Sequence, residues 1–462
     1  MAGQPRATLR AGLGALPDAR ACRGRCCVIA PAAEISHKRL LRIAFPIVIA
    51  NATVPLLGAV DVAVIGQIGQ AAPLGAVGLG AVILTTLYWI FGFLRMSTSG
   101  LAAQAQGAGD LAERTAVLLR ALLIGAAAGL ALIALQVPLF WAAFQVAPAS
   151  DAVEGYARAY LAIRIWGAPA TIMLYALSGW LIALERTRAV LVLQLVQNGL
   201  NVALNLWFVL GLDWGVGGVA TATLIAEWAG LALALWLARD GFGAVLAQAW
   251  GRVFHAAPLR AMFHASRDIM GRSVLLQVSF TSFVFLGARF GDVTLAANHV
   301  LMQFLELTAY ALDGFAFAAE ALVGQAVGAQ AWAQARRARV IAMQWGFAGA
   351  AAMALLFALF GGQIIGLMTT AQDVRTEAWR YLPWLVAAPV LGVASWILDG
   401  VFIGALLTGA MLRAMGIAVA LYAVALVVLI PLMGNHGLWA ALMLLNVLRA
   451  LTLWRALPEG LR

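Results

Sequence analysis

Long runs of apolar residues, broken by short charged or Pro/Gly-rich stretches, cover almost the whole chain after residue 37. Each run is as long as a membrane-spanning helix, which needs roughly 20 consecutive apolar residues. The expected helices are twelve, at 38–66, 74–104, 114–144, 154–184, 188–211, 215–239, 259–287, 294–325, 335–365, 375–406, 409–432 and 436–457. Several ranges exceed the minimum length, so tilted or kinked helices are expected.

The composition of the chain also indicates a membrane location. Hydrophobic residues make up 63% and charged residues 11% of the 462 positions, and the mean hydropathy is +0.92. This leaves too little polar surface for a water-soluble globule. A membrane β-barrel is excluded as well, because its strands alternate apolar and polar residues. The sequence therefore predicts an all-α integral membrane protein.

The two halves of the chain repeat each other at an offset of 221 residues. The first copy contains Leu101, Gln104, Ala105, Gly107 and Ala108, and the second contains Leu322, Gln325, Ala326, Gly328 and Ala329. Tyr160 matches Tyr381 and Gly179 matches Gly400 in the same register. The repeat predicts two pseudo-symmetric six-helix bundles, and duplicated bundles with a site between or within the halves are typical of transporters.

The expected organisation has two lobes joined by a short connection. The segments are an N-terminal tail at 1–37, an N-lobe at 38–239, a basic linker at 240–258, a C-lobe at 259–457 and a C-terminal tail at 458–462. Residues 1–34 contain scattered arginines and no apolar core segment, which argues against a cleaved signal peptide and favours disorder. Cys22, Cys26 and Cys27 all lie in this tail, so we expect reduced thiols and no metal site.

The net charge of +10 is distributed unevenly between the two sides of the predicted bundle. If the N-terminus is cytoplasmic, the outer loops receive few cations beyond Arg289 and Arg375. This asymmetry predicts both termini on the cytoplasmic side of a bacterial-type inner (plasma) membrane. No folded basic domain lies outside the helices, so a nucleic-acid partner is not expected.

Asp61 is the ionisable residue that most needs a functional explanation. A charge inside a span costs about 3 kcal/mol or more, and no basic residue lies between Arg42 and Arg95. Asp61 stands about 35 Å along its helix, in the outer half of a tilted or bent span. Pro46 and Pro55 precede it, and proline removes a helix hydrogen bond, so this helix is expected to bend when the local charge changes.

Three asparagines and a threonine are expected near the depth of Asp61. Asn198, Asn201 and Asn205 lie on the fifth predicted helix, and Thr223 lies on the sixth. Asn205 is about 26 Å from the inner start of its helix and Thr223 about 12 Å from the outer start of the next. A carboxylate with amide and hydroxyl oxygens can bind a proton or a hard cation such as sodium. For Asn198, structural hydrogen bonding between helices is an open alternative.

The second half contains its own intramembrane acids, which are Glu306, Asp313, Glu320 and Asp399. The expected counter-charges are Arg95, Arg164 and Arg413. Asp399 and Glu320 fall near the inner ends of their spans, which favours structural ion pairs. Asp313 is deeper and Glu306 is nearest the midplane, where it is a neutral hydrogen-bonding acid, a proton site or a charge facing a cationic substrate. Glu306, Asp313 and Asp399 are thus a candidate polar site of the C-lobe.

No pattern of catalytic residues is present in the sequence. The five histidines are dispersed, and no Gly-rich phosphate loop ends in Gly-Lys-Ser/Thr. We therefore expect no enzyme activity and no cofactor, which leaves coupling to an ion gradient as the energy source.

Several stretches resemble the multidrug and toxic compound extrusion (MATE) transporters, particularly their DNA-damage-inducible F (DinF) branch. They are PLLGAVDVAVIGQIG through Asp61, FLRMSTSGLAAQAQGAGD at 93–110, NGLNVALNLWFVLGLDWGVGGVATATLIAE at 198–227, LDGFAFAAEALVGQAVGA at 312–329 and LDGVFIGA at 398–405. The resemblance spans about 38–457. It implies a twelve-helix fold that exports cationic or amphipathic compounds in exchange for protons or sodium. It also implies that the carboxylate of Asp61 couples transport to the ion.

One position departs from the family pattern. Relatives often carry a second acid where this chain has Asn205, with Asn and Thr where Asn201 and Thr223 stand. Because an amide cannot take up a proton, a single carboxylate favours proton coupling through Asp61 over sodium coupling. Our hypothesis is that protonation from outside neutralises Asp61, bends the first helix and expels the substrate.

Two other functions are compatible with a helical membrane bundle. A flippase for lipid-linked precursors needs a cationic central cavity to hold pyrophosphate, which the few interior arginines and several acids disfavour. A receptor or scaffold would show no substrate flux and no dependence on Asp61. The expected partners are a small organic cation or amphipathic molecule and the lipid bilayer, and we expect a monomer.

Overall fold

The computed structural model describes residues 34–67, 71–147, 149–243 and 245–462, except for the side chains of 54–62. Within these residues the secondary structure is helical and contains no β-strand. The predicted N-terminal tail up to residue 33, with its three cysteines, lies outside the described residues. The predicted all-α class is confirmed.

Long helices follow one another in both halves of the chain. The first half contains α1 (His37–Gly66), α2 (Ala71–Trp89), α3 (Phe93–Gly107), α4 (Leu111–Ala134), α5 (Gln136–Val146), α6 (Asp151–Arg164), α7 (Ala168–Ala183), α8 (Thr187–Asn205) and α9 (Gly215–Leu237). The second half contains α11 (Ala256–Gly287), α12 (Asp292–Gly328), α13 (Trp332–Met368), α14 (Gln372–Gly404), α15 (Thr408–Met433) and α16 (Asn435–Ala456). Eleven helical segments of the described residues are long and apolar enough to cross a membrane, and α1, with 30 residues, adds the twelfth.

Three of the predicted spans are each built from two helices in line. Short 3-10 turns at Ile90–Gly92 and Ile165–Gly167 join α2 to α3 and α6 to α7. The third span breaks at Leu135, between α4 and α5. Pro138 follows this break, and its ring nitrogen cannot donate the hydrogen bond that would continue the helix. The α-helical hydrogen bonding of these spans is therefore interrupted within their length.

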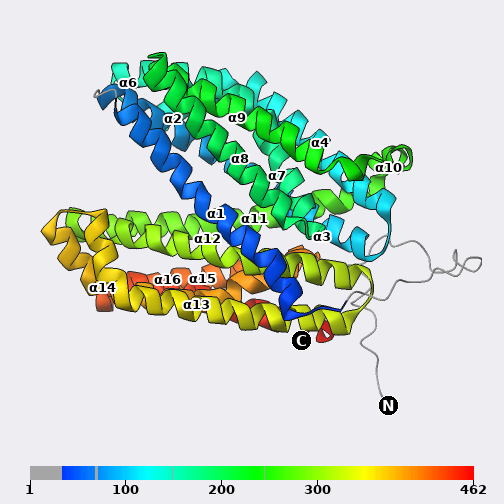
Figure 1. Cartoon of the computed structure of the whole chain (residues 1–462). Coiled ribbons are helices and arrows are strands. Elements are labelled where there is room, and N and C mark those ends of the chain that lie inside the picture. The colour runs from blue at the N-terminus through cyan, green and yellow to red at the C-terminus, as the bar shows by residue number, and fades with distance from the viewer. Residues whose placement is uncertain (1–33, 68–70, 148, 244) are drawn as a thin grey trace, which may run out of the picture.

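The helices form two bundles with α1 between them. Figure 1 shows α2 to α9 in one group, α11 to α16 in the other, and α1 running obliquely across both. α1 packs against α8 of the first bundle and α12 of the second. We call the bundle of α1 to α9 the N-lobe and that of α11 to α16 the C-lobe. The predicted architecture of two six-helix bundles is confirmed.

The two lobes meet where the ends of α3 and α12 cross, with Gly107 of α3 against Gln325 and Gly328 of α12 against Gln104. A Cβ atom added to Gly107 would lie 1.9 Å from the Gln325 carbonyl oxygen, and one added to Gly328 would lie 2.0 Å from that of Gln104. Only glycine allows two backbones to approach this closely. We call these four residues the interlobe contact, and they obey the 221-residue repeat.

Hydrogen bonds at the interlobe contact repeat with the same symmetry. Gln104 donates through Nε2 to the Gly404 carbonyl oxygen at 3.0 Å, which links α3 to the end of α14. Gln325 donates to the Ala183 carbonyl oxygen at 2.8 Å, which links α12 to the end of α7. The repeated glutamines of the sequence thus tie each lobe to the other.

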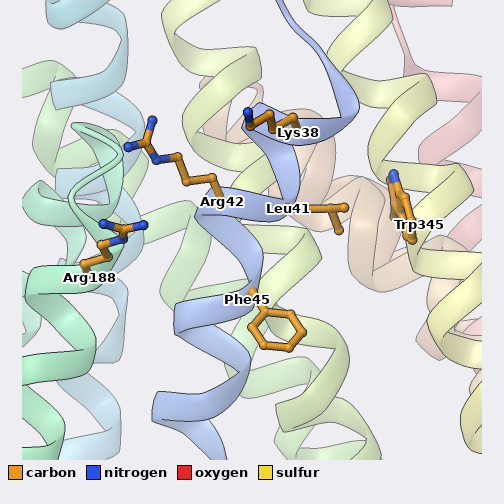
Figure 2. Close-up of a pocket in the computed structure, with 6 residues that line it drawn as sticks. All are labelled: Lys38, Leu41, Arg42, Phe45, Arg188 and Trp345. Carbon is orange, nitrogen blue, oxygen red and sulfur yellow. The ribbon is translucent and has the colours of Figure 1, made fainter.

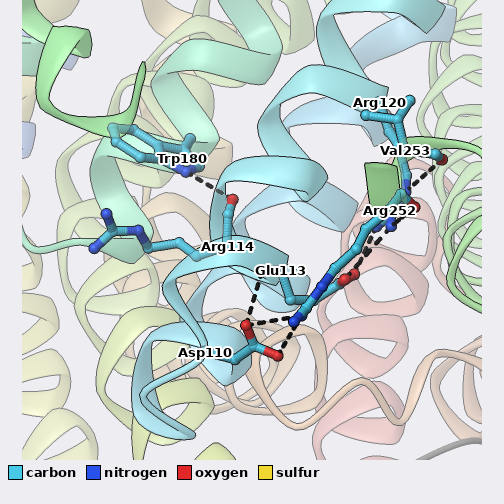
Figure 3. A network of polar contacts seen from close by, with 7 residues as sticks. All are labelled: Asp110, Glu113, Arg114, Arg120, Trp180, Arg252 and Val253. Atoms are coloured by element: carbon cyan, nitrogen blue, oxygen red, sulfur yellow. Dashed lines mark hydrogen bonds and ion pairs between the residues drawn. The ribbon is translucent and has the colours of Figure 1, made fainter. Parts of the chain in front are cut away.

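The segment between the lobes contains a short helix, α10 (Leu246–Val253), which the sequence pattern does not predict. Arg252 of this helix pairs with Asp110 at 2.7 Å. Arg120 of α4 donates to the carbonyl oxygens of Arg252 and Val253 at 2.7 and 2.9 Å and pairs with Glu113 (Figure 3). The last turn of α10 is therefore fixed to the N-lobe.

Candidate functional site

A chain of hydrogen bonds joins three of the predicted site residues in the N-lobe. Asn205 donates through Nδ2 to Oδ1 of Asn201 at 3.0 Å. Asn201 donates to Oγ1 of Thr223 at 2.9 Å, and Thr223 donates to the Val219 carbonyl oxygen at 3.0 Å. The asparagines are 1% and 0% exposed. This polar chain crosses from α8 to α9 in the interior of the lobe.

Asn198 uses its side chain to contact a different helix. Its Nδ2 atom donates to Oγ1 of Thr53 on α1 at 2.9 Å, and Thr53 donates to the Ala50 carbonyl oxygen at 2.7 Å. Asn198 therefore joins α8 to α1 rather than to the polar chain of α8 and α9. Thr53 is not among the predicted residues, although its place in the Asn-Ala-Thr-Val-Pro stretch before Asp61 is a signal for it.

Asp61 lies near the end of α1, five residues before its last residue, Gly66. The side chains of Asp61 and Pro55 lie outside the described part of the structure. Pro46 is half-buried within α1, and helical structure continues through both prolines. Bending at Pro46 or Pro55 thus stays a prediction. α1 packs along α8, the helix that carries the three asparagines.

The backbone widens directly after Asn205. Leu206–Gly211 forms a π-helical turn instead of a continued α-helix. Phe208 in this turn stacks on Trp214 with ring centroids 4.9 Å apart. Short π-helical segments occur frequently at functional sites. The pattern of apolar residues in the sequence does not distinguish such a turn from ordinary helix.

A buried ion pair lies elsewhere in the N-lobe, between α6 and α9. Arg164 and Glu227 approach to 2.7 Å, and both side chains are less than a tenth exposed. Arg164 was expected to balance acids of the C-lobe, and that expectation is wrong because its partner is in its own lobe. The sequence pattern does not single out Glu227, which lies within the span at the end of the Ala-Thr-Ala-Thr-Leu-Ile-Ala-Glu stretch.

Asp399 is the centre of an ion cluster in the C-lobe. Arg449 of α16 pairs with Asp399 at 2.7 Å, and Arg272 of α11 pairs with the same oxygen. All three side chains are less than a tenth exposed. The carboxylate is therefore shared by two guanidinium groups. Neither arginine was an expected counter-charge, because pairing between distant helices cannot be read from spacing along one helix.

Asp313 and Glu320 of α12 connect this cluster to the N-lobe. Asp313 is half-buried and interacts electrostatically with Arg95, Arg272 and Asp399. Arg95 belongs to α3 and lies 3.6 Å from Glu320, which is fully buried. Arg95, one of the expected counter-charges, thus belongs to the N-lobe and pairs with Glu320 of the C-lobe.

Two other charged candidates are not brought into these clusters. Glu306 is exposed on α12 and makes no ion pair with the residues that the structure describes. Arg413 is exposed on α15 and likewise has no acidic partner in the described part of the chain. Arg413 is therefore not the counter-charge that we expected for a buried acid.

Together these features define a class of protein. A duplicated helical membrane bundle, with separate buried polar clusters in its two lobes and an oblique helix between them, has the architecture of a secondary transporter. The matching family model is MatE, which covers residues 46–207 and 269–429 and thus matches once in each lobe.

Curated relatives and solved structures agree with this match. DNA damage-inducible protein F of Escherichia coli (strain K12) is 41% identical over 429 residues, covering 91% of this chain and 92% of the relative. The probable multidrug resistance protein NorM of Deinococcus radiodurans is 31% identical, covering 66% and 67% of the two chains. A mutant of a Vibrio cholerae MATE transporter has the same fold, with a TM-score of 0.79 and 22% identity over 91% of this chain and 95% of that one. The chain belongs to the MatE family and is a multi-pass membrane transporter, not an enzyme.

Proposed function

We propose that this transporter exports cationic or amphipathic organic compounds in exchange for protons, with Asp61 as the coupling residue. The observation that carries the proposal is the polar chain Asn205–Asn201–Thr223, built from amides and a hydroxyl on the helices next to α1. None of these three groups takes up a proton near neutral pH. A proton taken up in this region would therefore have to bind the carboxylate of Asp61.

Among the described residues of the N-lobe, the buried acid Glu227 already has a cationic partner. Glu227 is paired with Arg164 at 2.7 Å, and a guanidinium group keeps its charge in proteins. Protonation of Glu227 would leave a buried cation without its partner, which is costly. This pairing supports Asp61 as the coupling acid of the lobe.

Proton coupling is favoured over sodium coupling by the chemistry of the site. Sodium is a hard cation that is held by several oxygen atoms, preferably including carboxylates. At the position of Asn205 the chain supplies an amide, and the nitrogen of this amide donates to Asn201. A site with one carboxylate is sufficient for a proton and is weak for sodium.

The substrate class follows from relatives and from the charges inside the bundle. Relatives of this chain are named as probable multidrug resistance proteins. Among the buried cations, Arg164 is paired with Glu227, and Arg272 and Arg449 share the carboxylate of Asp399, so all three are already engaged and do not offer a free site for the pyrophosphate of a lipid-linked precursor. This supports an organic cation as substrate and disfavours flippase activity.

We further propose that the interlobe contact lies on the cytoplasmic side. α1 begins at the end of the bundle where α3 and α12 finish. That end carries most of the arginines and lysines. Cytoplasmic loops of membrane proteins are enriched in these residues. In this orientation the structure is closed towards the cytoplasm by the contact of α3 with α12.

The test is reconstitution of the purified chain into liposomes that are loaded or diluted to impose one gradient at a time. Ethidium, an amphipathic organic cation, is expected to move in the direction opposite to the proton flow when a proton gradient is imposed. It is not expected to move when only a sodium gradient is imposed. Movement driven by sodium alone would contradict proton coupling. Absence of ethidium movement under both gradients, with protein correctly inserted, would contradict the assigned substrate class.

A further inference from the structure

A cationic cavity lies at the beginning of α1, apart from the polar chain of α8 and α9. Its volume is about 630 Å³. The lining residues are Lys38, Leu41, Arg42, Phe45, Arg188 and Trp345. They come from α1, from the first turn of α8 and from α13, so both lobes contribute to the wall (Figure 2).

The three cations of this cavity are available to a ligand. Lys38, Arg42 and Arg188 are exposed, and none of them forms an ion pair within the described residues. Two acids at this end of the bundle are already engaged, since Glu185 accepts from Arg39 at 3.0 Å and Asp240 pairs with Arg186 at 3.0 Å. Three uncompensated cations around one cavity attract an anion.

The same cavity has an apolar side that extends from the charges. Lys38, Leu41, Arg42 and Phe45 follow one another at intervals of three, one and three residues, which places them on one face of α1. Phe45 is 65% exposed and lies about one helical turn further from the beginning of α1 than Arg42. Trp345 covers the α13 side and donates through Nε1 to Nδ1 of His37 at 3.1 Å.

We propose that this cavity binds an anionic phospholipid, with Lys38, Arg42 and Arg188 around its phosphate and its acyl chain along Leu41 and Phe45. Basic pockets between membrane helices bind anionic lipid headgroups. Guanidinium groups match the geometry of phosphate oxygens, which strengthens such contacts. Along α1 the charged residues lie at the beginning of the helix and the apolar residues lie further in. The headgroup and the acyl chain of a lipid have the same order in a bilayer.

A lipid would contact both the cationic and the apolar residues of the cavity, whereas a soluble anion would contact only the cationic ones. Inorganic phosphate would satisfy the cations but would leave the exposed Phe45 without a partner. A bound lipid would touch α1, α8 and α13 together, and it would therefore connect the two lobes beside the interlobe contact. This inference does not depend on the identity of the coupling ion or of the exported substrate.

The test compares lipid binding by the purified full chain in detergent, measured by native mass spectrometry. The probes are dioleoylphosphatidylglycerol, which is anionic, and dioleoylphosphatidylcholine, which is zwitterionic. The native chain is expected to bind the anionic lipid more tightly. In the double variant Arg42→Gln and Arg188→Gln, its affinity for the anionic lipid should fall roughly 30-fold, at about 1 kcal/mol per cation.

A matched control removes two cations from the same end of the bundle but outside the cavity. Arg260→Gln with Arg413→Gln changes two exposed residues and is expected to keep the native affinity. Equal losses in both double variants would show general attraction to the basic surface and would overturn the site. Equal binding of both lipids by the native chain, which needs no variant, would overturn it too.

Inorganic phosphate distinguishes the lipid from a soluble ligand. An excess of phosphate is expected to leave most of the bound phosphatidylglycerol in place, because the acyl chain adds contacts that the ion lacks. Complete displacement by phosphate would contradict a lipid site. The single variant Arg188→Gln gives a second measure if the double variant does not fold, and unchanged lipid affinity in it would also count against the proposal.

Discussion

Asn205 and Asn201 are the side chains on which the proposed preference for a proton over sodium depends. The amides of both residues form a continuous chain with Thr223. An amide nitrogen that donates in this chain stands where a carboxylate would offer an oxygen atom to a cation. The shared face of Asn201 and Asn205 could be predicted because residues four apart on a helix lie above each other. The bond from Asn201 to Thr223 could be anticipated only as a match in depth between two helices.

The first prediction concerns Asn205→Asp. A carboxylate in place of the amide would add a hard anionic ligand beside Asn201, which favours sodium. Ethidium transport by this variant is expected to respond to a sodium gradient that does not drive the native chain. Asn198→Asp is the matched control, because Asn198 bonds to Thr53 and not to the polar chain. An equal sodium response in the control, or none in Asn205→Asp, would argue against this view of the site.

At the level of helices, buried ion pairs fix the packing inside each lobe. Arg164 and Glu227 join α6 to α9, and Asp399 joins α14 to α11 and α16. These pairs are difficult to predict, since the sequence shows which residues are charged but not which distant helices become neighbours. The wrong expectation for Arg164 has this cause.

The second prediction tests the pair of α6 and α9. Glu227→Gln leaves the Arg164 charge buried without an acidic partner, which should lower the free energy of unfolding by about 3–5 kcal/mol. Replacing both residues by methionine should recover most of the loss, because no unpaired charge remains. The midpoint of thermal unfolding in detergent measures both effects. A native midpoint for Glu227→Gln would show that the pair contributes no stability.

The lengths of the helices were more predictable than their interruptions. Continuous apolar runs gave the positions of the spans, because lipid requires every backbone polar group to be bonded within the helix. The π-helical turn at Leu206–Gly211 and the linker helix α10 were not predicted. The linker helix is held by contacts with another segment, such as that of Arg252 with Asp110, which a local pattern does not reveal.

For the whole molecule, the internal repeat is visible as a symmetric contact between lobes. Gln104 and Gln325 make equivalent hydrogen bonds, and Gly107 and Gly328 allow equivalent close approaches. Transporters of duplicated bundles work by moving one half against the other around a central site. We therefore expect that the interlobe contact must open during each cycle.

The third prediction concerns a disulfide that would hold the two lobes together. Ser97 of α3 and Ser266 of α11 lie with their Oγ atoms 3.2 Å apart, across the boundary between the lobes. Cysteines at both positions should form a disulfide, whose sulfur atoms are about 2.05 Å apart, without large movement. Oxidation is expected to stop ethidium transport and reduction to restore it, in a chain whose Cys22, Cys26 and Cys27 are replaced by serine.

Ser97→Cys alone is the control for the cross-link. It carries the same buried change but cannot bridge the lobes, so oxidation should leave its transport unaltered. Unchanged transport by the fully cross-linked double variant would mean that the lobes do not separate at this end.

The central claim, that a proton on Asp61 drives export, is tested most directly by Asp61→Asn in proteoliposomes. The asparagine cannot exchange a proton, so ethidium transport driven by a pH gradient should be lost while the thermal midpoint and membrane insertion stay native. Asp213→Asn, the same change at an exposed residue between α8 and α9, should keep full transport. Transport by Asp61→Asn at the native rate under the same pH gradient would contradict the account.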